Sequence, residues 1–198
     1  MRMPPAAGLA PRARAGDARY HARIMTSRRR YVVFSHGKDS EPWGSKISLL
    51  AETARVEGYE VDSIDYRGID DPLVRVARLV EACQGLAGDL VLVGSSLGGY
   101  VALAAAALLH ARGVFLMAPA IYFDALPPLR ARPLDCPATI VHGWQDEIVP
   151  FEHSVRFGRE HGVTLHLLNA DHRMHGQLRT IQQLFERFII ELDLPEPR

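Results

Sequence analysis

A glycine- and serine-rich segment near the middle of the chain has the spacing needed to expose a nucleophile. The segment, GSSLG at residues 94–98, follows an apolar run and precedes an alanine-rich one. A strand that turns directly into a helix strains its apex residue, and small residues two positions before and after it prevent a clash. Gly94 and Gly98 meet this requirement for Ser96, whereas Ser95 would have valine and leucine there. Ser96 is therefore the candidate nucleophile, with a helix-capping serine in a glycine-rich turn as the alternative.

A serine nucleophile needs a base to accept its proton and an acid to orient that base, and two later loops supply both. Asp146 follows the apolar segment 138–143, and His172 follows the segment 163–168. Functional groups collect at the carboxyl ends of parallel strands, so we expect the three side chains at one edge of a sheet. The chain order Ser, Asp, His favours acyl transfer through a serine nucleophile.

Several neighbouring residues are alternatives for these roles. The alternative bases are His36, His142, His166 and His175, and the alternative acids are Glu147 and Asp171. We expect His36 and His142, each followed by glycine at a strand end, to support loops. A residue rarely turns back to its own sequence neighbour, so Asp171 is less suited than Asp146 to orient His172.

Metal and nucleotide chemistry are both disfavoured. His172 and His175 are three residues apart, but the chain has no HEXXH motif and no cysteine cluster. The glycine-rich segment 94–99 lacks the lysine of a P-loop and the spacing of a dinucleotide-binding fingerprint. We therefore predict no metal and no other cofactor.

Strand-like and helix-like segments alternate along the chain and would position these residues. We expect strands over 31–35, 59–66, 89–94, 113–119, 138–143 and 163–168, and helices over 44–58, 71–87, 98–111, 151–161 and 175–192. Parallel strands need crossover connections, which helices supply. The pattern predicts one α/β domain of about six mostly parallel strands with helices on both faces. The irregular stretch 119–137 is too short for a cap domain.

Composition and charge exclude several classes of protein. The 198 residues are 47% hydrophobic and 23% charged, which is typical of a soluble globular domain. No apolar run is long enough to cross a bilayer. Cys83 and Cys136 have no metal-type spacing, and no secretory signal is present, so we expect both to be reduced and the protein to be cytoplasmic.

The N-terminal segment differs in composition from the rest of the chain. Residues 1–30 contain eight arginines and a single acid, Asp17. The remaining residues carry 15 basic and 22 acidic side chains, a net charge of −7, so residues 31–198 have no electrostatic footprint for nucleic acid. We predict a disordered tail over 1–30, with translation starting at Met25 as the alternative, and a domain over 31–198.

Together these motifs resemble the α/β-hydrolase superfamily, and more narrowly its small lidless serine esterases with a VGSSLGG turn. The resemblance covers about residues 31–190 and rests on FSHGKDSEPWGSK, LVGSSLGGYVA, HGWQDEIVP and NADHRM. It implies that Ser96 is the nucleophile, Asp146 the acid and His172 the base.

The resemblance also implies an oxyanion hole, and residues in or beside the strand-end loops could line a substrate pocket. The backbone N–H groups of Leu97 and Lys38 would bind the oxyanion. The side chains that could line an acyl pocket are Trp43, Tyr100, Tyr122 and Met174. The family usually has glycine or asparagine beside the catalytic histidine and often an aromatic residue after it. Here Arg173 and Met174 follow His172, which changes the shape and polarity of the pocket.

The expected activity is hydrolysis of small, short-acyl carboxylic esters through an acyl-enzyme, in an open pocket without interfacial activation. A thioesterase or a small-peptide or amide hydrolase would use the same residues, and a non-catalytic interaction module is the alternative from another class. The expected partner is a small-molecule ester or thioester, with no nucleic acid and no membrane, and the protein is expected to be a monomer or homodimer.

Overall fold

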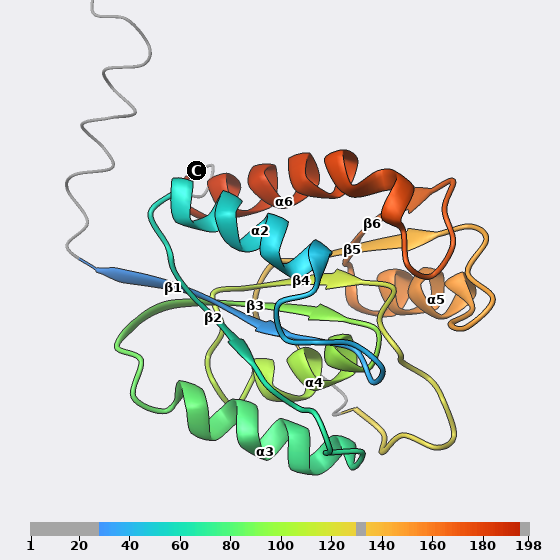
Figure 1. Ribbon diagram of the computed structural model, residues 1–198, viewed down its shortest axis with the longest axis horizontal. Helices are drawn as coiled ribbons and strands as arrows, with labels where there is room; N and C mark the ends of the chain where they lie inside the picture. The colour runs from blue at the N-terminus through green and yellow to red at the C-terminus, as the bar shows by residue number, and fades with distance from the viewer. Residues whose placement is uncertain (1–27, 130–133, 195–198) are drawn as a thin grey trace, which may run out of the picture.

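One parallel sheet organises the described part of the protein, as the sequence predicts (Figure 1). The computed structural model describes residues 28–129 and 134–194. Its strands are β1 (Arg29–Ser35), β2 (Glu60–Ile64), β3 (Gly88–Ser95), β4 (Gly113–Met117), β5 (Ala138–Gly143) and β6 (Thr164–Leu168). Its helices are α2 (Ser45–Val56), α3 (Pro72–Cys83), α4 (Leu97–Ala106), α5 (Phe151–His161) and α6 (Leu178–Leu192), and a short 3₁₀ helix, η1 (His175–Gln177), precedes α6.

The strand order, β2-β1-β3-β4-β5-β6, determines where a site can form. All neighbouring strands run parallel, so their carboxyl ends share one edge of the sheet. The chain passes outward from β1 to β2 and then returns to form β3 on the other side of β1. Ligands of open α/β sheets bind at such a reversal, outside the carboxyl ends of the strands. Here the loop after β1 and the turn after β3 meet at this point.

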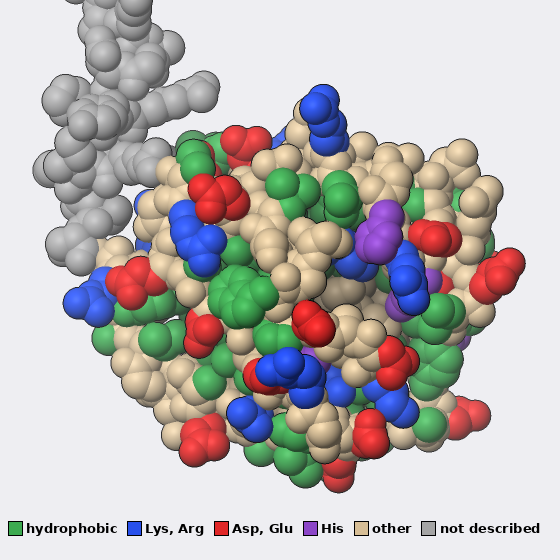
Figure 2. All heavy atoms as spheres, viewed as in Figure 1, with side chains coloured by type: hydrophobic (Ala, Val, Ile, Leu, Met, Phe, Trp, Pro, Cys, Tyr) green, Lys and Arg blue, Asp and Glu red, His purple; other side chains and the backbone are tan. Residues whose placement is uncertain are grey.

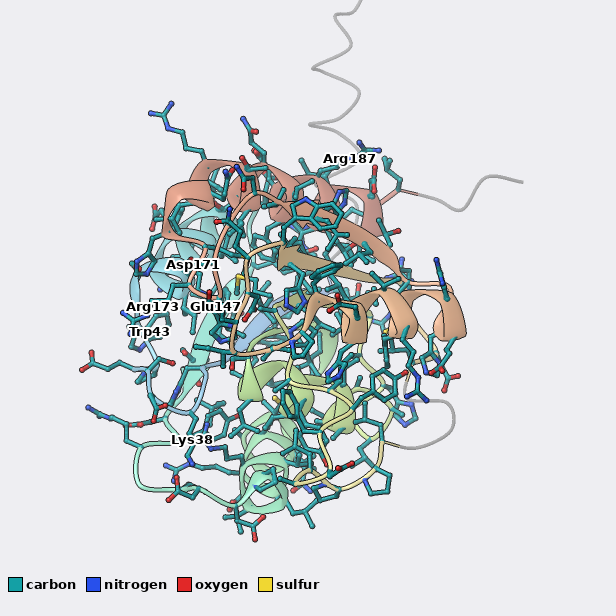
Figure 3. The ribbon with its side chains drawn as sticks, turned by 90° about the vertical axis from the view of Figure 1, so that its right-hand side faces the viewer. Lys38, Trp43, Glu147, Asp171, Arg173 and Arg187 are labelled. Carbon is teal, nitrogen blue, oxygen red and sulfur yellow. The ribbon has the colours of Figure 1, made fainter. Side chains whose placement is uncertain are left out.

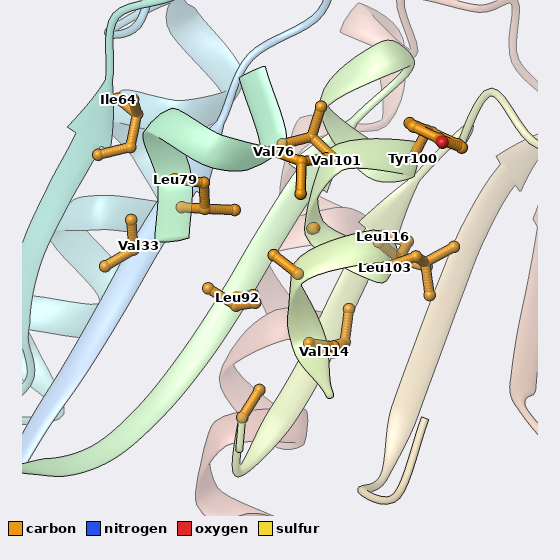
Figure 4. Packing of buried hydrophobic residues seen from close by; sticks show 14 of the residues in the cluster. Val33, Ile64, Val76, Leu79, Leu92, Tyr100, Val101, Leu103, Val114 and Leu116 are labelled. Carbon is orange, nitrogen blue, oxygen red and sulfur yellow. The ribbon is translucent and has the colours of Figure 1, made fainter. Parts of the chain in front are cut away.

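Both faces of the sheet are covered, which is why its central strands are apolar along their whole length. Helices α3, α4 and α5 cover one face, and α2 and α6 cover the other (Figure 1). Successive residues of β3 alternate between the two cores: Leu90 and Leu92 pack beneath α3 and α4, and Val91 and Val93 beneath α2 and α6. Figure 4 shows the first core. Each such side chain contributes about 1.5–3 kcal/mol when fully buried.

Strand β1 starts at Arg29, two residues before the predicted strand over 31–35, and so includes two residues of the predicted tail. Arg29 pairs with Gly88 in the sheet. Arg30 donates to the Glu57 carbonyl at 2.8 Å and lies over the ring of Tyr59 at 4.6 Å. These contacts incorporate the basic residues at the start of β1 into the sheet, at the amino ends of its strands. The predicted tail over residues 1–27, with the alternative start at Met25, lies outside the described residues.

The connection between β4 and β5 is the longest irregular part of the domain. Its described residues, 118–129 and 134–137, contain neither helix nor strand. The remaining predicted elements agree with the structure to within a few residues, although α3 ends at Cys83 and α4 at Ala106, earlier than expected. None of the described helices combines the length and the apolar character that crossing a membrane requires. Acidic and basic side chains are interspersed on the face shown in Figure 2.

Candidate active site

Ser96 forms the apex of a sharp turn between β3 and α4. Its backbone lies at φ 53° and ψ −121°, a conformation that costs a non-glycine residue about 1–3 kcal/mol. Two flanking glycines make the turn possible: a Cβ at Gly94 would lie 2.3 Å from the Gly98 carbonyl oxygen, and a Cβ at Gly98 would lie 2.0 Å from the Ser35 carbonyl oxygen. Ser96 is half-buried between buried neighbours, so its side chain stands at the surface of the turn.

Asp146 and His172 are joined by a direct hydrogen bond. His172 Nδ1 donates to Asp146 Oδ2 at 2.7 Å. The loops that carry them, after β5 and after β6, are bound to each other through the main chain. Trp144 N–H donates to the Leu168 carbonyl at 2.8 Å, and Gln145 N–H donates to the Ala170 carbonyl at 2.9 Å. The pair is therefore held by the register of the neighbouring strands β5 and β6.

The Asp146 carboxylate is buried and saturated with donors. Oδ1 accepts from the N–H groups of Ile148 at 2.9 Å and Val149 at 2.8 Å, while Oδ2 accepts from His142 at 3.0 Å and from His172. Burial by itself would raise the pKa of this carboxyl, but the hydrogen bonds outweigh it and hold the pKa well below its usual range. Asp146 is therefore ionised and can hold one tautomer of His172.

His142 is a second histidine on the same carboxylate. Its Nε2 faces two acceptors, Asp146 Oδ2 at 3.0 Å and the Val149 carbonyl at 3.1 Å, so Nε2 carries the proton. Its Nδ1 accepts from the Ser154 hydroxyl at 2.7 Å. With both ring nitrogens occupied and no exposed surface, His142 supports the acid and cannot serve as the base.

His172 keeps one ring nitrogen available for proton transfer. Its Nδ1 is bound to Asp146, so Nε2 is the nitrogen that can accept a proton in the neutral imidazole, and its side chain is 16% exposed. Within the described residues, no hydrogen bond joins His172 to Ser96 Oγ. Such contacts are often long in substrate-free structures and shorten when substrate binds. The structure thus pairs the expected acid and base, and it leaves the contact between base and nucleophile open.

The alternative bases and acids have other partners or positions. His36 is buried, accepts the Tyr66 N–H at Nε2 and donates from Nδ1 to the Gly37 carbonyl, so both nitrogens are used. Asp171 accepts from the Met174 N–H at 2.8 Å and is exposed, as is Glu147. Of the other alternative bases, His166 lies in β6 and His175 lies in η1. Figure 3 looks onto the carboxyl end of the sheet, where Lys38, Trp43, Glu147, Asp171 and Arg173 are labelled.

The two backbone N–H groups expected to bind an oxyanion lie near Ser96. Leu97 is the first residue of α4, where an N–H has no intrahelical acceptor. Lys38 follows Gly37, whose Cβ, if it had one, would lie 3.3 Å from the Ser96 Cβ. Neither N–H donates to an acceptor within the described residues. The positive end of the α4 dipole adds to the stabilisation of a negative charge there.

Two of the expected pocket residues have almost no exposed surface. Tyr100 is 2% exposed and packs in the core beneath α3, because α4 is buried on almost every side and its first turn points into the domain. Met174 has no exposed surface and packs beneath α6. Trp43 remains 43% exposed beside α2. Tyr122 is half-buried, and its ring lies against α5, 6.3 Å from the Phe157 ring.

A lysine that sequence reasoning missed lies beside the turn. Lys46, in the first turn of α2, donates from Nζ to Ser95 Oγ at 3.3 Å. Burial lowers its pKa to about 8, against the attraction of Asp146 and Asp171. The only feature of the sequence that indicated Lys46 was its position shortly after the first strand. A long polar side chain there can reach the edge of the sheet formed by the carboxyl ends of the strands.

Comparisons with known proteins agree with this fold. The family model described as "Alpha/beta hydrolase family" matches residues 32–189. A protein of the alpha/beta hydrolase superfamily from Xanthomonas campestris pv. campestris is 28% identical, with a TM-score of 0.76 over 82% of this chain and 99% of that one.

More distant solved structures share the fold. Est1E from Butyrivibrio proteoclasticus is 18% identical with a TM-score of 0.71, covering 86% of this chain and 91% of that one. The monoacylglycerol lipase of Paleococcus ferrophilus is 17% identical with a TM-score of 0.69, covering 82% and 94%. A search of curated proteins found no match. The matched residues include all or part of every strand and the loops that carry Ser96, Asp146 and His172, and the chain therefore belongs to the alpha/beta hydrolase family.

Proposed function

We propose that this protein is a serine hydrolase that cleaves small, short-acyl carboxylic esters, with Ser96 as nucleophile, His172 as base and Asp146 as acid. The observation that carries the proposal is the 2.7 Å hydrogen bond from His172 Nδ1 to a buried, ionised Asp146. The hydrogen bonds to the Asp146 carboxylate fix the orientation of the His172 ring. They leave His172 Nε2 without a partner among the described residues at the carboxyl edge of the sheet, where the strained Ser96 turn also lies. Membership of the family supports a hydrolase.

The reaction would proceed in two halves. His172 Nε2 accepts the Ser96 proton while Oγ attacks the ester carbonyl carbon, and the N–H groups of Leu97 and Lys38 bind the resulting oxyanion. Each such donor is worth about 3 kcal/mol of barrier. The protonated His172 then gives its proton to the departing alkoxide, which leaves as an alcohol. Water attacks the acyl-enzyme, His172 accepts the water proton, and the carboxylic acid is released as Ser96 regains its proton.

Short acyl chains are favoured because little of the chain is available to cover the site. The described residues between β4 and β5 form no helix or strand that could act as a cap. Tyr100 and Met174 are enclosed in the cores, so they cannot extend an acyl channel into the domain. A substrate with a long chain would therefore leave most of its apolar surface in water.

A chain-length series of p-nitrophenyl esters, from acetate to palmitate, tests this proposal. We expect kcat/KM to be highest for the two- to four-carbon esters and to fall with longer chains. Ser96→Ala should lose activity by at least about 1,000-fold, as removal of a catalytic serine does, whereas the matched control Ser95→Ala should keep most of it. A maximum at long chains would contradict the substrate class, and loss of activity only in Ser95→Ala would contradict the nucleophile.

Thioesters and amides separate the alternatives that share the same residues. A parallel series of short acyl thioesters and p-nitroanilides should react more slowly than the matching oxygen esters. A higher kcat/KM for a thioester would make the protein a thioesterase with the same mechanism. A folded protein that is inert toward all three series would favour a non-catalytic interaction module.

A further inference from the structure

An arginine is buried in the core next to the loop after β1. Arg75 lies in α3 and is 1% exposed, and no described carboxylate lies within 4.0 Å of it. Burial of a charge without an opposite partner costs several kcal/mol. Methionine would fill similar space without that cost. Packing alone therefore does not explain why an arginine occupies this buried position.

The guanidinium of Arg75 is bound by main-chain carbonyl groups. Nε donates to the Ile69 carbonyl at 2.6 Å, and Nη1 donates to the carbonyls of Gly37 at 3.3 Å and His36 at 3.5 Å. Its Cζ lies 5.2 Å from the centre of the Tyr66 ring. The side chain thus connects the loops that follow β1 and β2, on the side of the sheet covered by α3.

The Gly37 carbonyl oxygen accepts from three donors in all. Besides Arg75, His36 Nδ1 donates at 2.8 Å and Ser40 Oγ donates at 3.3 Å. The His36 proton must be on Nδ1, because its Nε2 accepts the Tyr66 N–H at 2.9 Å. Three converging donors fix the plane of one peptide group, the bond between Gly37 and Lys38.

That peptide carries the N–H expected to bind the oxyanion. In a trans peptide the C=O and N–H point in opposite directions. The carbonyl is directed toward Arg75 and α3, so the Lys38 N–H points away from α3, and Gly37 itself lies against Ser96. The positively charged Arg75 guanidinium, which is bound to the carbonyl oxygen, also polarises the peptide and strengthens its N–H as a donor.

We propose that Arg75 is a positioning residue that aligns and polarises the Gly37–Lys38 peptide, so that the Lys38 N–H binds the oxyanion formed at Ser96. The inference rests on the proposed function and adds a residue from α3 to it. Arg75 acts through the peptide and does not touch the substrate. Its loss should therefore weaken binding of the transition state and leave binding of the ester nearly unchanged.

The test compares Arg75→Met and Arg75→Lys with the wild-type protein, using p-nitrophenyl acetate and a small alkyl trifluoromethyl ketone. The ketone accepts Ser96 Oγ at its carbonyl carbon and forms a hemiketal oxyanion, while the serine proton passes to His172. We expect Arg75→Met to lower kcat about 10- to 30-fold, below the ~100-fold or greater loss of an oxyanion donor itself. KM should stay within about two-fold, and the ketone should bind weaker by the same factor as kcat. Arg75→Lys should recover part of the loss, because the ammonium can still reach one carbonyl.

Arg112→Met is the matched control. Arg112 also binds a main-chain carbonyl, donating from Nη2 to Leu192 at 2.8 Å. It precedes β4, at the amino ends of the strands. We expect Arg112→Met to lower the free energy of unfolding without changing kcat or ketone binding. If the role of Arg75 were purely structural, Arg75→Met would also lower the free energy of unfolding without changing kcat or ketone binding.

The possible results separate this inference from the proposed function. If Arg75→Met is folded and keeps wild-type kcat and ketone affinity, the positioning role is wrong while the hydrolase stands. If the wild-type protein neither hydrolyses the ester nor binds the ketone, the proposed function fails and the positioning role fails with it. If Arg75→Met does not fold, Ser40→Ala removes another donor to the same oxygen from the surface. Ser40→Ala should lower kcat about two- to five-fold and leave KM unchanged. If kcat is unchanged in both Ser40→Ala and Arg75→Lys, the inference is overturned.

Discussion

Replacement of Asp146 by asparagine changes one functional group and tests the arrangement of the site. The wild-type carboxylate accepts four hydrogen bonds, two on each oxygen. Asparagine keeps one acceptor oxygen, and the main-chain N–H groups of Ile148 and Val149 cannot change their polarity. The amide oxygen should therefore face these N–H groups, and the amide NH₂ should face His142 and His172.

This orientation forces the wrong tautomer on the base. An NH₂ group donates to His172 Nδ1, so the imidazole proton moves to Nε2, the nitrogen that must accept the serine proton. We expect kcat to fall by about 10⁴, the loss that the same change causes in other triads, or about 5.5 kcal/mol of barrier. KM should change little because Asp146 is fully buried and does not meet the substrate.

The same variant has a predictable effect on stability. Two hydrogen bonds to a charged group are lost, which lowers the free energy of unfolding at pH 7 by about 3 kcal/mol. The folded-state pKa of Asp146 is depressed, so its contribution to stability is present above the ordinary carboxyl pKa of about 4 and is lost as pH falls toward the folded value. The stability difference between wild type and variant should therefore shrink below pH 4.

Ester hydrolysis and urea unfolding between pH 2.5 and pH 8 measure both effects. Asp171→Asn is the control, since this neighbouring acid is exposed and accepts only the Met174 N–H. More than a tenth of wild-type kcat in Asp146→Asn, or a comparable loss in Asp171→Asn, would refute the assignment of the acid.

Three further variants test other parts of the structure. His142→Phe removes a donor from the buried Asp146 carboxylate and should lower the free energy of unfolding by about 2 kcal/mol and kcat several-fold. His142→Gln should restore part of both losses. Equal values for the two variants would contradict the hydrogen-bonding role of His142. Gly98→Ala places a Cβ 2.0 Å from the Ser35 carbonyl oxygen and should lower Tm by about 10 °C in thermal unfolding, whereas Gly85→Ala, with no atom within 4 Å, should not. Lys46→Met should be about 1–3 kcal/mol more stable than wild type in urea at pH 7. The folded-state pKa of Lys46 is about 8 and its ordinary value 10.5, so wild-type stability should rise with pH between these values and the variant should lack that rise.

The sheet and its order along the chain could be predicted because both faces are covered. Strands buried on two sides are apolar at every position, as in LVLV at residues 90–93, and this signal needs no knowledge of their partners. The start of β1 was missed for the opposite reason. Arg29 and Arg30 look like tail residues, and only their contacts with Gly88, Glu57 and Tyr59 bring them into the domain.

The site itself was predictable only in part. Residue type and strand-end position were enough to select Asp146 and His172 as partners, since the turns after neighbouring parallel strands must meet. The exposure of the expected pocket residues was not predictable, because whether Tyr100 and Met174 are buried depends on how α4 and the loop before η1 pack against the rest of the domain. Arg75 carried no local signal and Lys46 only a weak one, because an arginine or lysine in a helix is usually solvated and its partners lie far away in sequence.

The most direct measurement is the reaction of the pure protein with a fluorophosphonate probe, followed by mass spectrometric mapping of the adduct. An activated serine displaces fluoride and keeps the phosphonyl group, and no substrate needs to be known. We predict one phosphonyl group per protein molecule, on Ser96, with no labelling of Ser96→Ala and full labelling of Ser95→Ala. A folded protein that remains unlabelled, or that is labelled on a serine other than Ser96, would contradict the proposal that Ser96, His172 and Asp146 form a working catalytic site.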